Sequence, residues 1–543
     1  MPILRGGRRP DARSLESPMI RPLPAALSVA IAAVLLACAA PSPARADGPN
    51  PERLFAEHCA ACHGGDRLGA IGPALLPENL GRLKPAEAER IIRHGRPATQ
   101  MPGFPAETLS DEAVRVLAAY VFTPLPEVPA WGMEEIAASR VVHKDPATLP
   151  EKPRHGADPL NLFTVVEAGD HHVSIVDGDR FTVLDRFESR FALHGGAKYS
   201  PDGRFVYLAS RDGWVSKYDL HSLSLVAEVR AGVNTRNVAV SSDGRFLMVG
   251  NTLPHTLVAL DARDLTPIKV IPVTDGKGKS SRVSAVYSMP PRNSFVAALK
   301  DLQEVWELPW DDRPVYAGLV HSHEPGREEA VSLPGPFPVR KLKVNEFVDD
   351  FFFDQPYDQL MATSRDGKKG IVVHMDVGRQ IAELDLPGMP HLGSGINFVH
   401  EGRPVMATPH FKDPVISVID TVDWKTVKRI PMPGPGFFLR GHENTPYAWA
   451  DAYMGKDRDT IPIIDTRSLE IVNTLRPAPG KLTAHVEFTR DGRYALVSVM
   501  EDEGAIVVYD AATFAEVKRL PMRKPIGKYN VWNKINFSSG TSH

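Results

Sequence analysis

The sequence predicts two folds in one chain: a small all-α domain followed by an all-β eight-bladed β-propeller. The motif Cys59-Ala60-Ala61-Cys62-His63, with helix signals around it, predicts the first. Short strands separated by Asp-Gly turns predict the second. We expect four parts, with boundaries at 1–46, 47–125, 126–160 and 161–537.

Residues 1–46 have the features of a signal peptide with an upstream extension. Arg21 supplies positive charge, residues 25–40 supply an apolar stretch, and Ala44-Arg45-Ala46 is a small-x-small cleavage site. Met19 would start a signal of more usual length, so residues before it form the extension. We therefore expect export to the periplasm.

A second interpretation of this segment involves lipid attachment. Leu35-Leu36-Ala37-Cys38 resembles a lipobox, and membrane attachment would follow only if Cys38 were lipidated. Leu36 is not the favoured residue type there, and the cleavage site offers an alternative, so a soluble periplasmic protein is favoured. Cys59 and Cys62 are the only other cysteines, which predicts a protein without disulfides.

Charge and hydropathy give no indication of nucleic acid binding or of a membrane-spanning segment after the signal. The chain has 543 residues, with 63 Lys and Arg against 66 Asp and Glu. No basic excess indicates nucleic acid binding. No apolar run after the signal is long enough to span a bilayer.

The Cys-x-x-Cys-His motif is the c-type haem attachment motif, and it predicts a cytochrome c domain over 47–125. Cys59 and Cys62 would add to the two vinyl groups of the porphyrin, and His63 would ligate the iron. A disulfide or an unrelated Cys-x-x-Cys is the alternative. The adjacent histidine favours one covalent haem c per chain.

Helix signals around the motif agree with a small cytochrome. A helix is expected from Glu52 into the motif, a second over 85–94 between Pro85 and Gly95, and a third beginning at Ser110. Met101 lies between the last two helices, where a thioether could ligate the iron opposite His63. Packing is the other role for this methionine.

The remainder of the chain changes composition twice. We expect residues 126–160 to be a linker. Seven prolines, one of them just before this range, exclude long regular elements there. From 161 to 537, the turns at Asp202-Gly203, Asp243-Gly244 and Asp491-Gly492 each separate apolar strand-like runs. A strand-built unit of about 40 to 50 residues is typical of a β-propeller, and the length allows about eight blades.

Candidate ligands on the propeller are histidines and arginines in loop-like contexts. The histidines are His194, His391, His410 and His442. With 19 histidines in the chain, an ordinary hydrogen-bonded imidazole is the simpler interpretation of each alone. Three arginines could hold carboxylates by bidentate hydrogen bonds, and each alone could equally be exposed: Arg211, Arg236 and Arg282.

The haem attachment motif, the linker and the propeller together resemble the cytochrome cd1 nitrite reductase family along most of the mature chain. Five segments carry the resemblance: Phe191 to Arg204 around His194, Asn234 to Val238, Ser281 to Val283, Pro390 to His400 with Thr408 to His410, and Ile526 to Asn533. The resemblance implies His194 as the proximal ligand of haem d1. It also implies Arg236 and Arg282 near its carboxylates, and His391 and His410 on its distal side.

The resemblance implies two activities. Some members keep haem d1 and reduce nitrite to nitric oxide; others oxidise dihydro-haem d1 by converting a propionate to an acrylate. Reductases can place an N-terminal arm tyrosine over the d1 iron. Here only 47–58 precede the motif in the expected mature chain, and no tyrosine precedes Tyr120. We therefore expect the dehydrogenase, with the nitrite reductase and a non-catalytic haem d1 carrier as alternatives.

The dehydrogenase interpretation assigns roles and partners. Dihydro-haem d1 would be ligated by His194 or another pocket histidine, with His391 and His410 as candidate proton acceptors. Electrons would pass to haem c and then to a small periplasmic acceptor. The cytochrome cd1 nitrite reductase would receive the finished haem d1.

Overall fold

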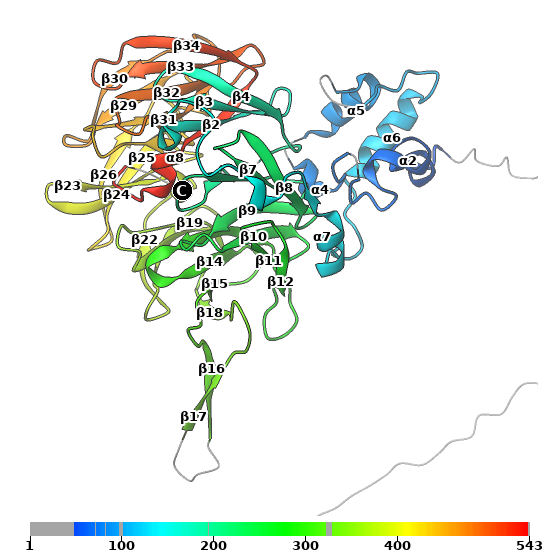
Figure 1. The fold of residues 1–543 in the computed structure, drawn as a ribbon, viewed down its shortest axis with the longest axis horizontal. Helices are drawn as coiled ribbons and strands as arrows, with labels where there is room; N and C mark the ends of the chain where they lie inside the picture. Colours follow the sequence, from blue (N-terminus) through cyan, green and yellow to red (C-terminus); the bar gives the residue numbers. More distant parts are fainter. Residues whose placement is uncertain are drawn as a thin grey trace, which may run out of the picture. The chain divides into compact units, whose positions relative to one another are not determined.

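Eight β-sheets arranged around a common axis form most of the structure, which is a computed structural model (Figure 1). It describes residues 48–70, 72–81, 83–96, 101–193, 195–321 and 328–540.

 The predicted signal peptide and Cys38 lie outside the described residues, as does His194.

The helices of the N-terminal part follow the sequence signals. Ser110 begins α6 and accepts a hydrogen bond from the Ala113 amide at 3.2 Å, and Gly95 ends α5 with a positive φ of 73°. The predicted helices over 85–94 and from Ser110 are confirmed. The helices of the described chain are α2 (Pro51–His58), α3 (Ala60–His63), α4 (Pro77–Leu80), α5 (Pro85–His94), α6 (Asp111–Val121), α7 (Met133–Ser139) and α8 (Val531–Ile535).

The proline-rich segment is more ordered than its composition predicts. It contains α7, whose Ile136 is fully buried in a cluster with propeller residues, and the short strand β1 (Val141–Val142). Trp131 donates its indole N–H to the Arg230 carbonyl at 2.9 Å. The prolines exclude long elements but not short ones, and this segment lies against the propeller.

The predicted eight-bladed propeller is confirmed by eight antiparallel sheets in the described residues. In each, the first-named strand lines the central channel. The first four blades are β35 (Pro525–Asn530), β2 (Leu162–Glu167), β3 (His172–Asp177), β4 (Thr182–Glu188); β5 (Lys198–Tyr199), β6 (Phe205–Ala209), β7 (Trp214–Asp219), β8 (Ser224–Arg230), with β1 added at the outer edge; β9 (Asn234–Val240), β10 (Phe246–Leu253), β11 (Thr256–Asp261), β12 (Pro267–Pro272); and β13 (Val283–Met289), β14 (Ser294–Leu299), β15 (Glu304–Pro309), β18 (Arg340–Lys343).

The other four blades repeat this arrangement. They are β19 (Val348–Phe353), β20 (Gln359–Ser364), β21 (Gly370–His374), β22 (Arg379–Leu384); β23 (Ile396–His400), β24 (Arg403–Pro409), β25 (Val415–Asp420), β26 (Lys425–Pro431); β27 (Leu439–Arg440), β28 (Tyr447–Ala450), β29 (Ile461–Asp465), β30 (Glu470–Leu475); and β31 (Thr483–Phe488), β32 (Tyr494–Val499), β33 (Gly504–Asp510), β34 (Glu516–Met522). A separate hairpin, β16 (Tyr316–His321) and β17 (Glu328–Ser332), extends away from the ring (Figure 1).

The ring closes because its last strand joins its first sheet. β35 pairs antiparallel with β2, with Tyr529 opposite Thr164. The cores lie between neighbouring blades: Met248, Phe295 and Trp306 belong to one such layer. The inner strands begin at one mouth of the channel, which we call the first mouth, and end at the second mouth.

Candidate functional site

The haem attachment motif lies on one short helical turn. His63 is buried, and its Nδ1 donates to the Pro73 carbonyl at 2.8 Å, which leaves Nε2 as the nitrogen able to ligate iron. Both cysteines are free thiols. Burial, and then Cys62, raise the pKa of Cys59 to about 11, so the thiol is protonated at neutral pH.

The backbone at Gly72 packs closely against the His63 imidazole. A Cβ at Gly72 would lie 2.8 Å from Cε1 of His63, so only glycine allows this approach. Met101 follows α5, and its carbonyl accepts from the Arg96 amide at 3.2 Å. The donor set of two thiols and one oriented imidazole fits a covalent haem c.

The first mouth brings together two of the candidate histidines. The His391 amide donates to the Pro409 carbonyl at 2.9 Å, and Pro390 forms an isolated bridge with His410. His391 Nδ1 donates to the Phe437 carbonyl at 2.8 Å, and its Nε2 lies 3.8 Å from Asp350 Oδ2. Aromatic rings pack against His391, including Phe411 at 4.9 Å between ring centroids.

His410 is fully buried. Its Nδ1 donates to the Pro387 carbonyl at 2.6 Å, while its Nε2 has no hydrogen-bond partner among the described residues. Burial is the main cause that lowers the pKa of both His391 and His410, so both imidazoles are neutral at pH 7. A neutral imidazole can accept a proton.

Two of the arginines lie beside the segments that flank His194. The Arg211 amide donates to the Ala192 carbonyl at 3.0 Å. A Cβ at Gly195 would lie 3.2 Å from the Arg236 carbonyl oxygen. The third arginine, Arg282, is held by a carboxylate: its Nε and Nη2 donate to Asp301 at 2.8 and 2.7 Å.

The structure adds buried polar residues that sequence patterns did not indicate. Asp451 accepts from the Phe437 amide at 2.7 Å, and burial raises its pKa to about 6. His485 is buried with a positive φ of 56°, which is strained for a histidine. Neither lies in a recognisable motif. Asp451 directly follows β28, whereas His485 lies on the inner strand β31, where alternation along the strand is the signal that could have suggested its position. His442 lies elsewhere, just after β27, at the second mouth.

Contacts join the cytochrome part to the first mouth. Asn79 Nδ2 donates to the Val233 carbonyl at 3.1 Å, and Asn234 Nδ2 donates to the Glu78 carbonyl at 3.3 Å. Arg230 donates to the Leu68 carbonyl. The segment that follows the haem attachment motif therefore lies against the propeller near Arg211 and Arg236.

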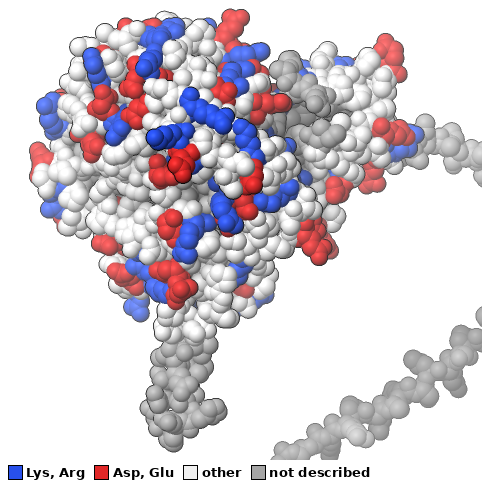
Figure 2. All heavy atoms as spheres, viewed as in Figure 1, with Lys and Arg blue, Asp and Glu red and all other residues white. Residues whose placement is uncertain are grey.

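Charges elsewhere on the surface are mixed. Figure 2 shows basic and acidic side chains interspersed over the face in view, in line with a formal net charge of −3. Among the described residues, no helix is long and apolar enough to cross a membrane.

A c-type cytochrome joined to a β-propeller whose first mouth gathers histidines and arginines defines a class of two-domain haem proteins. Residues 157–323 and 332–534 match the family described as "Cytochrome D1 heme domain", and residues 46–121 match "Cytochrome C oxidase, cbb3-type, subunit III". The chain therefore belongs to the cytochrome D1 heme domain family.

Relatives within this family differ in their sequence identity to this chain. The chain is 56% identical over 493 residues to the dihydro-heme d1 dehydrogenase of Pseudomonas aeruginosa, covering 91% of this chain and 95% of that protein. It is 26% identical to the nitrite reductase of Stutzerimonas stutzeri, and the match covers 96% of this chain and 99% of that protein. A solved structure of the dihydro-heme d1 dehydrogenase NirN in complex with DHE aligns with a TM-score of 0.84 and 55% identity, covering 90% of this chain and all of that one.

Proposed function

We propose that this protein is a dihydro-haem d1 dehydrogenase of haem d1 biosynthesis. It oxidises a propionate side chain of dihydro-haem d1 to an acrylate and passes the electrons to its covalent haem c. The observation that carries this proposal is the similarity, over nearly the whole length of both proteins, to the dehydrogenase of Pseudomonas aeruginosa. Similarity to the nitrite reductase is much lower.

The propeller residues bind and orient the tetrapyrrole substrate. His194 is the proposed ligand of its iron, and Arg211, Arg236 and Arg282 are the proposed partners of its carboxylates. The contacts of Arg211 and Arg236 with the flanking segments of His194 support one shared site. Asp301 already holds Arg282, so that arginine would share its donors between two carboxylates.

Removing two hydrogen atoms from the propionate releases two protons and two electrons. His391 and His410 are the proposed proton acceptors, since each is buried and neutral at pH 7. The Phe437 carbonyl orients the His391 ring through Nδ1, and the Pro387 carbonyl does the same for His410. In both rings, Nε2 is left as the proton-accepting atom.

The cytochrome residues hold the electron carrier. Cys59 and Cys62 attach haem c, His63 ligates its iron, and Met101 is the proposed second ligand. When bound, this haem supplies one-electron redox chemistry. Because two electrons leave the substrate, an external acceptor must accept an electron during each turnover. The hydrogen bonds from Asn79 and Arg230 keep the haem-binding segment beside the first mouth.

The expected cellular setting follows from the chemistry. A covalently attached haem c and the predicted signal peptide support a periplasmic location. A small periplasmic electron acceptor and the cytochrome cd1 nitrite reductase, as recipient of haem d1, are the proposed partners.

Anaerobic incubation of the oxidised holoprotein with dihydro-haem d1 tests the proposal. We expect the absorption bands of haem c to change to those of the reduced form, and mass analysis to find a tetrapyrrole lighter by two hydrogen atoms. An unchanged tetrapyrrole would contradict the dehydrogenase. Nitrite turnover after loading with haem d1 would then separate a reductase from a carrier.

A further inference from the structure

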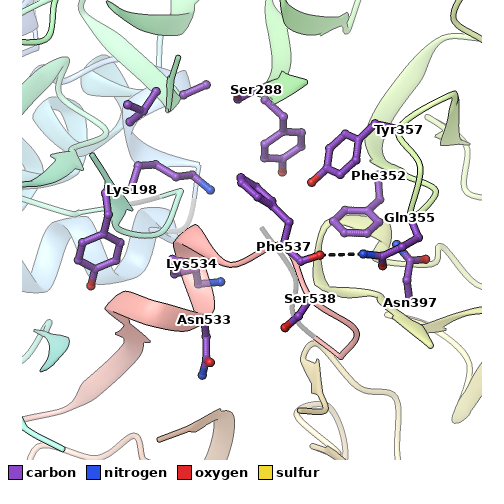
Figure 3. Close-up of a pocket in the computed structure, with 14 residues that line it drawn as sticks. Lys198, Ser288, Phe352, Gln355, Tyr357, Asn397, Asn533, Lys534, Phe537 and Ser538 are labelled. Atoms are coloured by element: carbon purple, nitrogen blue, oxygen red, sulfur yellow. Dashed lines mark hydrogen bonds between the residues drawn. The ribbon is translucent and has the colours of Figure 1, made fainter. Parts of the chain in front are cut away.

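A partly open cavity lies in the part of the channel where inner strands end. Its volume is about 90 Å³, enough for several waters or one small anion. Figure 3 shows Lys198 and Lys534 entering it from different elements. Its polar lining includes Lys198, Tyr287, Ser288, Asn397, Asn533 and Lys534.

The C-terminal segment covers the second mouth next to this cavity. Gln355 Nε2 donates to the Phe537 carbonyl at 2.7 Å, a bond drawn in Figure 3. The Gly540 amide donates to the Asn397 carbonyl at 2.8 Å, and the Gly441 amide donates to the Gly540 carbonyl at 3.0 Å. These bonds hold the C-terminal segment beside the cavity at this end.

Positive charge exceeds negative charge around the cavity. Lys198 and Lys534 line it, and Arg440 lies nearby. Burial first, and then the charge of Arg440, lower the pKa of both lysines, and the pKa of Lys534 falls well below its ordinary value. Lys534 therefore contributes to the site as a hydrogen-bond donor. Carboxylates lie near this group as well: Glu487 Oε2 is 3.5 Å from Arg440 Nε, and the charge of Asp350 acts on Tyr287. Among the described residues, Lys198 forms no ion pair; its recorded contact is the Tyr287 ring, 5.5 Å from Nζ to the centroid.

Several buried polar atoms here also have no partner within the described chain. Ser288 Oγ is one of them. Arg440 is only 5% exposed, and its Nε has an ion-pair partner in Glu487 but no hydrogen bond among the described residues. Burial of uncompensated charge is costly, so a lysine in such a place must either lose its proton or gain a negative partner. Burial lowers the pKa of Lys198 only to about 8, which leaves most of its population charged at pH 7.

We propose that this cavity is a binding site for a small monovalent anion, a halide or a carboxylate group, held by Lys198 and Lys534. Ser288 supplies a further hydroxyl donor, and Arg440 adds positive charge from the adjacent wall. Two sources offer this chemistry: a free anion from solution, or a side-chain carboxylate of a tetrapyrrole bound at the first mouth.

Crystals of the holoprotein soaked in bromide test the site directly. We expect an anomalous scattering peak between Lys198 and Lys534. Absence of that peak at high bromide concentration would overturn the proposal. Repeating the soak after loading with dihydro-haem d1 identifies the source: loss of the peak indicates a tetrapyrrole carboxylate, and retention indicates a free anion.

Thermal unfolding in bromide, at constant ionic strength with sulfate as the balancing anion, gives a second measurement. We expect bromide to raise the unfolding midpoint of the wild type, and Lys198→Met to weaken the apparent bromide affinity at least about tenfold. Lys198→Arg keeps the charge and should keep the response. The matched control is Lys217→Met, because Lys217 is also buried but donates to the carbonyls of Ala262 and Arg263 at 2.9 and 2.8 Å.

An equal bromide response in wild type and Lys198→Met would overturn the proposal. The crystal soak keeps it testable if Lys198→Met does not fold. Neither measurement depends on turnover, so a failure here is distinct from a failure of the proposed dehydrogenase activity.

Discussion

The guanidinium of Arg282 donates two hydrogen bonds to the carboxylate of Asp301, of 2.8 and 2.7 Å. Asp301 also accepts from Arg365 Nη1 at 3.2 Å, so one carboxylate links two arginines. This pairing positions Arg282 at the first mouth before any ligand binds. It also stabilises the fold through the pKa of Asp301, which these contacts lower to about 2.

Asp301→Asn is expected to lower the free energy of unfolding by about 1 kcal/mol at pH 7, after allowance for solvent screening. Because the pKa of Asp301 is depressed in the folded state, its stabilisation is present above pH 3.8 and is lost as the pH falls toward 2. Urea unfolding of both proteins at several pH values measures this. Asp502→Asn, at an exposed position, is the control. An equal loss of unfolding free energy in that variant would contradict the assignment.

Gly72→Ala is expected to displace the His63 ring, since the added Cβ would lie 2.8 Å from Cε1. Overpacking of this kind costs about 1–3 kcal/mol. We expect a lower yield of haem-loaded protein and an altered haem c spectrum. Gly65→Ala is the matched control, because nothing lies within 4 Å of its Cβ. Unchanged spectra in both variants would show that the close approach to His63 is unimportant.

Met101→Ala is expected to remove the charge-transfer absorption band of methionine-ligated haem and to lower the reduction potential of haem c. Met133→Ala, in the exposed first turn of α7, should leave both unchanged. Spectra of the oxidised protein and a redox titration provide the measurements. Retention of the band in Met101→Ala would exclude this ligand.

His194→Ala is expected to abolish the spectral change on binding dihydro-haem d1, because the proposed iron ligand is lost. His400→Ala is a control at the second mouth, where Nδ1 of His400 donates to the Thr466 carbonyl at 3.1 Å. Titration of each holoprotein with the tetrapyrrole measures affinity. Wild-type spectra in His194→Ala would assign the ligand to another histidine.

His391→Gln and His410→Gln are expected to slow haem c reduction by dihydro-haem d1 about 10²–10⁴-fold while binding is retained. Burial lowers the pKa of both imidazoles, so the wild-type rate should fall only when the pH drops below the ordinary histidine value of 6.5. Single-turnover rates measured between about pH 5 and 8, the range in which histidine titrates, test this. His143→Gln, on the exposed strand region beside β1, should behave as the wild type.

The sequence by itself determined the features that depend on neighbouring residues. The haem attachment motif needs only five consecutive residues, and Gly95 and Ser110 define the ends of α5 and α6 through local backbone chemistry. Asp-Gly turns and apolar runs likewise predict the strands of each blade. Their repetition over a known length predicted eight blades, because each blade is a local unit.

Only the tertiary structure decided which distant residues meet. It paired β35 with β2, placed Pro390 beside His410, and brought Arg282 into an ion pair with Asp301. It also ordered the proline-rich segment, because Ile136 finds an apolar surface that composition cannot show. The cavity between Lys198 and Lys534 exists because blades far apart in sequence share one channel, and their burial and charge follow from that closure rather than from any local pattern.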